Sequence, residues 1–450
     1  MASTVVVPRR LITARLRLNP AQTILLGFAA VILAGGVLLS LPISAENGQP
    51  TPFLTALFTA NSATCVTGLV VVDTADHYSP FGELVIMLLI QLGGFGYMTS
   101  WALLAMLLGW RIGLRDRIIL TEAHNLYQMG GVVRFTQRLI VLALSIEVIG
   151  AAILALRWVR EVPVGRAIYL GIFHSISAFN NAGFDLMGGF RSLTGYVGDP
   201  VVSLTIAGLI VVGGLGFTVL FDLRSRRLTL HSRTVLLSTV ILIVGGAVVI
   251  WLLEFRNPKT LGGLSAPVQA LAALFQAVTP RTAGFNTVPI GGLAQSTLML
   301  IVALMFIGAS PGGTGGGIKT TTFIAPLAVI WSTIRGANEP VLFHRRLPVL
   351  VIYKAVTIAL VSVAFVVTMT LLLVQVDGRD FLSSLFEVTS AFGTVGLSTG
   401  ITPDLSTWGR LIVMMTMFGG RVGLLTVVYG LARQQRPLRV RYPEERVYLG

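Results

Sequence analysis

The chain has 450 residues, of which 54% are hydrophobic and only 12% are charged. Soluble domains carry about 25% charged residues, so this composition excludes an ordinary soluble protein. The net charge of +14 could suggest a nucleic-acid partner. The basic residues instead lie in the connections between long apolar segments, which indicates membrane topology, and we expect no nucleic-acid binding. Cys65 is the only cysteine, which excludes an intrachain disulfide and a cysteine metal cluster.

Eight segments are apolar and long enough to cross the ~30 Å hydrocarbon core of a bilayer. They lie near residues 22–42, 83–109, 138–157, 200–221, 234–254, 296–332, 350–375 and 408–431. Only the sixth is expected to be interrupted. Most of the 33 Lys and Arg residues lie in the termini and in alternate connections. The positive-inside rule therefore predicts a multi-pass protein of the cell membrane, with residues 1–21 and the tail 432–450 in the cytoplasm.

The remaining four connections each contain an apolar segment that is too short to span a bilayer. These segments are residues 53–69, 168–184, 270–285 and 381–397. Each ends in a glycine followed by Leu or Phe, with a phenylalanine nine or ten residues earlier. The glycines are Gly68, Gly183, Gly284 and Gly396, and a second glycine cluster follows each of them by 23–30 residues. The pattern predicts four repeats of span, short re-entrant helix, extended strand and span, over residues 22–110, 134–224, 234–333 and 349–431.

This repeat predicts an all-α integral membrane protein with one pore on a pseudo-fourfold axis. Non-helical backbone at membrane depth is tolerated where it is buried in protein or lines a water-filled cavity. Four re-entrant segments around one axis meet that condition together, because their carbonyl oxygens can replace the hydration shell of a cation. Glycine adopts backbone conformations denied to other residues, and it leaves no Cβ in the pore. The short helices would also aim their partly negative C-terminal ends at the ion.

The sixth span contains a glycine-rich run that cannot continue as a helix. Six glycines and Pro311 lie between Gly308 and Gly317, and strongly apolar sequence flanks both sides. The flanks favour an unwound loop inside the bilayer over a disordered linker. Such a loop could block conduction and move aside. The predicted gating loop, 308–318 with the lysine that follows, includes Gly308, Ser310, Pro311, Gly312, Gly313, Thr314, Gly315, Gly316, Gly317 and Lys319.

The chain resembles the membrane subunit of the Trk/Ktr/HKT superfamily of potassium transporters over residues 20–430. The resemblance rests on the runs SAFNNAGF (177–184), TPRTAGF (279–285) and SAFGTVGL (390–397). It implies potassium uptake through a filter whose carbonyls hold the ion. The implied filter residues are Val66, Thr67, Gly68, Asn181, Ala182, Gly183, Thr282, Ala283, Gly284, Thr394, Val395 and Gly396. All four filter positions are glycine, as in potassium-permeable members of the family.

The short stretch before the first span is typical of the Ktr branch. Membership in that branch implies a homodimer with one pore per protomer. It also implies docking on a cytoplasmic nucleotide-binding ring of the RCK type, where ATP and ADP act on the partner rather than on this chain. Sodium stimulation is a further family expectation. No covalent cofactor is expected.

Five ionisable residues lie at membrane depth or in the pore segments, where charge is costly and often functional. The resemblance makes Arg421 an electrostatic barrier or a loop anchor beneath the filter; the alternative is packing against a carboxylate. Lys319 could be part of the gate or could snorkel to the cytoplasmic interface. Glu147 is expected to be a structural partner, and Glu387 to hydrogen-bond loops behind the filter. The resemblance also implies that Arg281 supports the filter from behind.

Three other functions compete with a pore. A sodium- or ammonium-permeable secondary transporter with alternating access also uses repeats and broken helices. An intramembrane enzyme needs a catalytic pair at membrane depth, and the sequence contains none that we can identify. A receptor or scaffold gives no reason for glycines in the short segments. We therefore expect a transport protein and not an enzyme.

Overall fold

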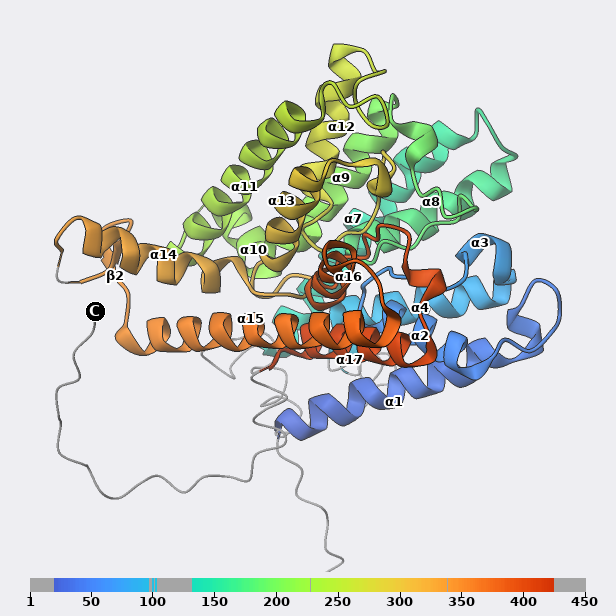
Figure 1. Ribbon diagram of the computed structural model, residues 1–450, viewed down its shortest axis with the longest axis horizontal. Helices are drawn as coiled ribbons and strands as arrows, with labels where there is room; N and C mark the ends of the chain where they lie inside the picture. The colour runs from blue at the N-terminus through green and yellow to red at the C-terminus, as the bar shows by residue number, and fades with distance from the viewer. Residues whose placement is uncertain are drawn as a thin grey trace, which may run out of the picture.

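The computed structural model describes residues 20–96, 99–100, 102, 132–226, 228–337 and 339–424. These residues form helices joined by loops, as the predicted all-α fold requires (Figure 1). The strands in the described ranges are β1 (Val341–Leu342) and β2 (Arg345–Arg346), which form a small antiparallel hairpin. Most of the predicted N-terminal segment 1–21, the inner end of the second span and the tail 432–450 lie outside the described residues.

Four long apolar helices form the periphery of the molecule. They are α1 (Pro20–Ser40), α7 (Val132–Trp158), α11 (Leu230–Glu254) and α15 (Val349–Asp377). Each is apolar and long enough to cross a membrane, yet only 22–33% of its most apolar stretch is buried in protein. The exposed side chains include Val148, Val240 and Leu360. An apolar exterior of this kind is what the hydrocarbon core of a bilayer accommodates.

The other predicted spans are broken, and this corrects the expectation that only the sixth is interrupted. α4 (Pro80–Phe95), α9 (Pro200–Leu215) and α17 (Thr407–Val422) end at Gly96, Gly216 and Gly423, where φ is +77°, +91° and +89°. Glycine adopts this left-handed region without steric cost, and a helix cannot continue through it. After Gly216 the chain turns by 95° into α10 (Phe217–Ser225). The sixth span is divided into α13 (Gln295–Phe306) and α14 (Thr320–Ile334).

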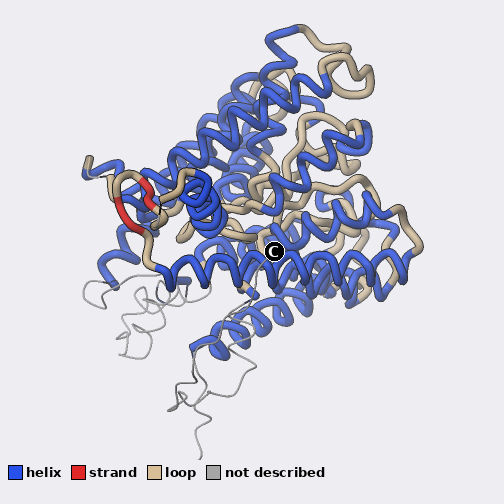
Figure 2. The backbone as a smooth tube through the Cα atoms, turned by 60° about the vertical axis from the view of Figure 1, so that its left-hand side comes forward, coloured by secondary structure: helices blue, strands red, loops and turns tan. Residues whose placement is uncertain are grey.

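Four short helices return into the middle of the molecule between the spans. They are α2 (Phe53–Thr64), α8 (Val164–Phe179), α12 (Ala266–Val278) and α16 (Phe381–Gly393). Their shared phenylalanines, Phe58, Phe173, Phe275 and Phe386, are almost completely buried. We call these the pore helices, and the side from which they enter the outer side. Figure 2 shows loops meeting at the centre of the molecule, with the β1–β2 hairpin at one edge.

Short elements lie on the outer side, and acidic residues there cap the starts of three helices. These elements are α3 (Thr74–His77) and the 3₁₀ turns η1 (Pro42–Ser44), η2 (Thr194–Tyr196), η3 (Ile290–Gly292) and η4 (Thr402–Asp404). Asp73, Asp199 and Asp380 accept backbone N–H groups at the starts of α3, α9 and α16. Such caps stabilise helix starts, so each of these three carboxylates has a local structural role.

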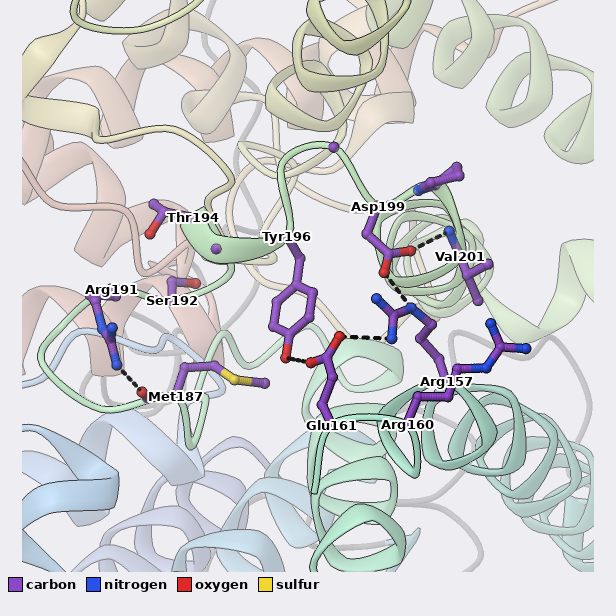
Figure 3. Close-up of a pocket in the computed structure, with 13 residues that line it drawn as sticks. Arg157, Arg160, Glu161, Met187, Arg191, Ser192, Thr194, Tyr196, Asp199 and Val201 are labelled. Carbon is purple, nitrogen blue, oxygen red and sulfur yellow. Dashed lines mark hydrogen bonds and ion pairs between the residues drawn. The ribbon is translucent and has the colours of Figure 1, made fainter. Parts of the chain in front are cut away.

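A polar cluster joins the outer ends of α7 and α9 (Figure 3). Arg157 Nε lies 2.6 Å from Asp199 Oδ2, and one of its terminal nitrogens lies 2.7 Å from Glu161 Oε1. The Tyr196 hydroxyl donates to Glu161 Oε2 over 2.7 Å. The cluster lines a hollow of about 970 Å³ on the outer face, and the lining includes none of the four repeat glycines. We therefore assign it a role in holding the second repeat together.

Glu254 supports the third repeat and provides a test of the fold. Its fully buried carboxylate accepts hydrogen bonds from four groups, the Ala294 N–H and the side chains of Asn257, Thr260 and Thr297, at 2.5–2.9 Å. We expect Glu254→Ala to destabilise the protein by about 2–4 kcal/mol, because several buried donors lose their acceptor. The unfolding midpoint in detergent should fall. Glu339→Ala is the control, since Glu339 makes an exposed ion pair with Arg346. Equal midpoints for the two variants would contradict this assignment.

Candidate ion pathway

The glycines that end the four short segments lie side by side in a closed ring, which we call the glycine ring (Gly68, Gly183, Gly284 and Gly396). A Cβ added to Gly68 would lie less than 3.0 Å from the Ala182 oxygen. At each of the other three glycines, an added Cβ would also lie less than 3.0 Å from a carbonyl oxygen of the next repeat around the ring. The pairs are Gly183 with Ala283 O, Gly284 with Val395 O, and Gly396 with Thr67 O. The four repeats therefore surround one axis in chain order, and any side chain larger than hydrogen would strike the neighbouring backbone.

The backbone of the four segments has one shared conformation. Each glycine has φ between +72° and +95°. The residues two positions earlier, Val66, Asn181, Thr282 and Thr394, also have positive φ, between +50° and +75°. Positive φ is uncommon in residues other than glycine, so four occurrences at equivalent positions mark a shared structural requirement. Positive φ thus alternates with negative φ along each segment, so the carbonyls need not point to opposite sides in turn as they do in an ordinary strand.

The pore helices hold this backbone with the same hydrogen bond in every repeat. The residue before each glycine donates its N–H to a carbonyl near the end of the helix: Thr67 to Ser62, Ala182 to Ser177, Ala283 to Thr279 and Val395 to Ser390, at 2.8–3.0 Å. The Ser62 and Ser390 hydroxyls also accept from the N–H of Gly68 and Gly396, both at 3.1 Å. The helix C-terminal ends, which carry partial negative charge, thus lie beside the ring.

The second glycine cluster allows the following spans to approach the pore helices. A Cβ on Gly93, Gly213 or Gly420 would lie less than 3.0 Å from the carbonyl oxygen of Thr64, Phe179 or Phe392, respectively. These three carbonyls belong to the residues four positions before the ring glycines. The repeated cluster is thus explained by close packing against the ends of three pore helices.

A hollow of about 270 Å³ opens on the outer side of the ring. All four ring glycines line it, together with Asp73, Asp185, Asn286 and Ser398. Behind it, the buried Glu387 carboxylate accepts hydrogen bonds from the hydroxyls of Ser398, at 2.7 Å, and Thr402. This carboxylate therefore fixes the segment that follows Gly396, at the position where the sequence suggested hydrogen bonds to loops behind the filter.

The glycine-rich run between α13 and α14 lies on the other side of the ring. The Thr314 hydroxyl donates to Phe179 O over 3.1 Å, and Gly316 N–H donates to Thr394 Oγ1 over 3.0 Å. A Cβ on Gly315 would overlap the Thr282 side chain. The run closes on itself through Gly308 N–H to Ile318 O at 2.9 Å. It is a folded loop pressed against the inner side of the glycine ring, and not an open linker.

Arg421 reaches this loop from α17. Its guanidinium donates to Thr314 O in the loop and to Gly93 O at the end of α4, with Gly94 O at 3.3 Å. No carboxylate in the described ranges lies within ion-pair distance of Arg421. The packing alternative, an arginine held by an acid, is therefore wrong for the described residues.

The structure agrees with some of the roles suggested for the remaining ionisable residues and not with others. Lys319 is half-buried and donates from Nζ to Gly315 O over 2.7 Å, so it folds back onto the loop and does not snorkel. Glu147 accepts from Gln91 and Asn180 at 2.9–3.1 Å, which links α7, α4 and the end of α8. This is the structural partnership that the sequence suggested. Arg281 is 7% exposed, and the structure shows no hydrogen bond from it to the filter segments.

Two features of the site were not predicted. The hydroxyls of Thr282 and Thr394 contact the loop and neighbouring side chains, whereas the sequence suggested only a role for their carbonyls. The sequence also did not predict that the side chains of Gln91, Glu147 and Asn180 form one hydrogen-bond network. Both depend on contacts between repeats that are distant in the chain, and the sequence signal for them is limited to polar residues within apolar segments.

Comparison with known proteins agrees with this architecture. The family model for TrkH, described as a cation transport protein, matches residues 28–435. "Ktr system potassium uptake protein B" of Bacillus subtilis is 43% identical, over 96% of this chain and 97% of that protein. The protein of the same name from Vibrio alginolyticus is 41% identical, over 95% and 94%. "Potassium/sodium uptake protein NtpJ" of Enterococcus hirae is 37% identical, over 97% and 98%.

A solved structure shares the fold at much lower sequence identity. The potassium transporter TrkH from Vibrio parahaemolyticus superposes with a TM-score of 0.74 at 18% identity, covering 94% of this chain and 87% of that one. The near full-length matches confirm the predicted resemblance. The chain is a membrane protein that belongs to the TrkH family of cation transport proteins, and it is most similar to Ktr-type members among the relatives named above.

Proposed function

We propose that this protein takes up potassium ions through the glycine ring. The observation that carries the proposal is the closed ring of four equivalent backbone segments, with an outer hollow on one side and a glycine-rich loop on the other. Relatives that match nearly the whole chain are described as potassium uptake proteins. The name of a third relative adds sodium, so sodium is a candidate second ion or activator.

The ring residues and those before them would form the selectivity filter. Potassium is the cargo, and carbonyl oxygens of the four segments would replace its hydration shell. The glycines are required because the neighbouring carbonyls leave no room for a Cβ. Pore helices whose C-terminal ends face the ring add cation selectivity without a fixed charge. Asp73 and Asp185 in the outer hollow would raise the local cation concentration before entry.

The loop 308–318 would be the gate. It occupies the inner side of the ring and is held there by hydrogen bonds to other repeats, among them those from Thr314 to Phe179 O and from Gly316 to Thr394. Arg421 would stabilise the closed state in two ways. It ties Thr314 O to α4, and its positive charge repels a cation that leaves the filter. Opening therefore requires the loop to exchange these hydrogen bonds for water.

We infer four repeats with the bounds predicted from the sequence, and a channel-like mechanism. An alternating-access carrier would be built from two halves that rock around a fixed site. Four re-entrant segments that enter from one side and meet around one axis favour a pore instead. By similarity to the Ktr proteins we further propose a homodimer in the cell membrane with both termini in the cytoplasm. An RCK-type ring that binds ATP or ADP would regulate it, and we expect no enzymatic activity.

Gly284→Ser tests the filter. Gly284 has φ +81°, and its Cβ would strike Val395 O, so serine strains the backbone by about 1–3 kcal/mol where ions pass. We expect potassium uptake into proteoliposomes to fall roughly tenfold or to shift toward sodium. Gly336→Ser is a matched control, because Gly336 also has positive φ (+68°) but has nothing within 4 Å of its Cβ position. Unchanged uptake by the Gly284 variant would favour a carrier in which the glycines do not line the path.

Arg421→Gln tests the gate. Glutamine lacks the charge and the second donor group that join Thr314 O to Gly93 O, so the closed loop should be less stable. We expect potassium flux in the absence of any regulatory subunit to rise by roughly tenfold, as a loss of about 1.4 kcal/mol of closed-state stability predicts. Arg410→Gln on the same helix is the control, since Arg410 bonds to outer groups such as Leu405 O. A folded Arg421 variant with unchanged or lower flux would contradict the gating role.

A further inference from the structure

A groove of about 1210 Å³ lies between the start of α7 and α10. Arg134, Arg138 and Val141 line it from α7, and Phe221 and Arg224 line it from α10. The rings of Phe135 and Phe221 meet edge to face at 5.3 Å and join the two helices beside it. The lining contains no residue of the glycine ring or of the loop 308–318. α10 nevertheless begins beside that loop, where the Phe217 N–H donates to Gly312 O over 3.1 Å.

The groove lies at the inner end of the membrane-spanning region. α7 runs from this end to Trp158 on the outer side, where the chain turns into the pore helix α8. α10 is bent by 95° from the spanning helix α9, so it runs across the direction of the spans. A helix in this orientation at the inner end lies at the level of lipid headgroups. The predicted topology makes this the cytoplasmic leaflet.

The charge of the groove is positive, and no ion pair among the described residues compensates it. Arg134 and Arg138 are exposed, one helical turn apart, and Arg224 is exposed opposite them. No hydrogen bond or ion pair joins any of the three to another residue in the part of the chain that the structure describes. Asp222 is the acid in the lining, and its Oδ2 already accepts from the hydroxyls of Thr229 and Ser232 at 2.7 and 2.6 Å. Among the residues that the structure describes, the three arginines therefore have no partner that would compete with an anion.

An apolar strip continues from the groove along α7. Val141 in the lining is 65% exposed, and Val148, two turns further toward the outer side, is 67% exposed. Both lie on the helix face that carries Arg134 and Arg138. A soluble anion would bind only the arginines and would leave the apolar strip uncovered. A phospholipid matches both features, because its anionic headgroup fits the arginines and its acyl chain fits the exposed valines. Basic pockets between helices at the cytoplasmic side are typical binding sites for anionic lipid headgroups.

We propose that the groove between α7 and α10 binds an anionic phospholipid of the cytoplasmic leaflet. The lipid phosphate lies among Arg134, Arg138 and Arg224, and one acyl chain follows Val141 and Val148. The lining includes no residue of the proposed filter or gate, and binding is measured directly, so the proposal can be tested whether or not the chain conducts potassium.

The experiment measures lipid binding directly by native mass spectrometry of the full-length protein in detergent. Phosphatidylglycerol is titrated, with phosphatidylcholine as the neutral lipid. The test variant is Arg134→Gln/Arg138→Gln. The matched control is Arg345→Gln/Arg346→Gln, which removes the same charge from the exposed β1–β2 hairpin outside the groove. We expect the control to bind phosphatidylglycerol like wild type and the test variant to bind it roughly tenfold more weakly, with equal binding of phosphatidylcholine. An unchanged unfolding midpoint establishes that the test variant is folded.

Three results would overturn the proposal. Equal phosphatidylglycerol binding by the two variants would place the lipid elsewhere. Displacement of the lipid by millimolar glycerol 3-phosphate or inorganic phosphate would show a site for soluble anions. A change of the dimer fraction in the test variant, without any difference in lipid binding, would show that the groove is covered by a second copy of the chain.

Discussion

The structure depends on one constraint, which is that extended backbone inside a bilayer must find partners for its polar groups. The four filter segments meet this constraint together. Each N–H before a ring glycine donates to the end of its own pore helix, and the ring closes because each glycine lies against a carbonyl of the next repeat. One segment alone would leave several buried carbonyls without partners in hydrocarbon. The repeats therefore stabilise one another, and in the proposed function the carbonyls of these segments would hold the cation.

Glycine has three separate tasks in this architecture. In the ring it permits positive φ and close approach at Gly284 and its counterparts. At Gly93, Gly213 and Gly420 it lets the next span touch the C-terminal carbonyls of three pore helices. At Gly96, Gly216 and Gly423 it ends those spans with a left-handed residue. The third repeat departs from the pattern, because its glycines form a loop that lies against the ring.

The same constraint applies to the loop and Arg421, which we propose to form the gate. A polar loop at membrane depth is stable only while its backbone is bonded, and here much of that bonding comes from other repeats: Phe179, Thr394 and Arg421. In the proposed mechanism, water would replace these contacts when the loop opens. A charge at membrane depth costs free energy, and Arg421 has no carboxylate partner among the described residues. The carbonyls of Thr314 and Gly93 offset part of that cost.

The sequence by itself determined the membrane class, the long spans, the four short segments, the ring glycines and the family. These properties depend on composition and on local spacing, which a single chain displays directly. Only the tertiary structure decided the order of the repeats around the axis, the breaks at Gly96, Gly216 and Gly423, and the carbonyl partners of Arg421. The same holds for Lys319, which folds back onto the loop, and for the basic groove beside α10. Each of these depends on which distant segments meet, and residue spacing along the chain carries no record of such contacts.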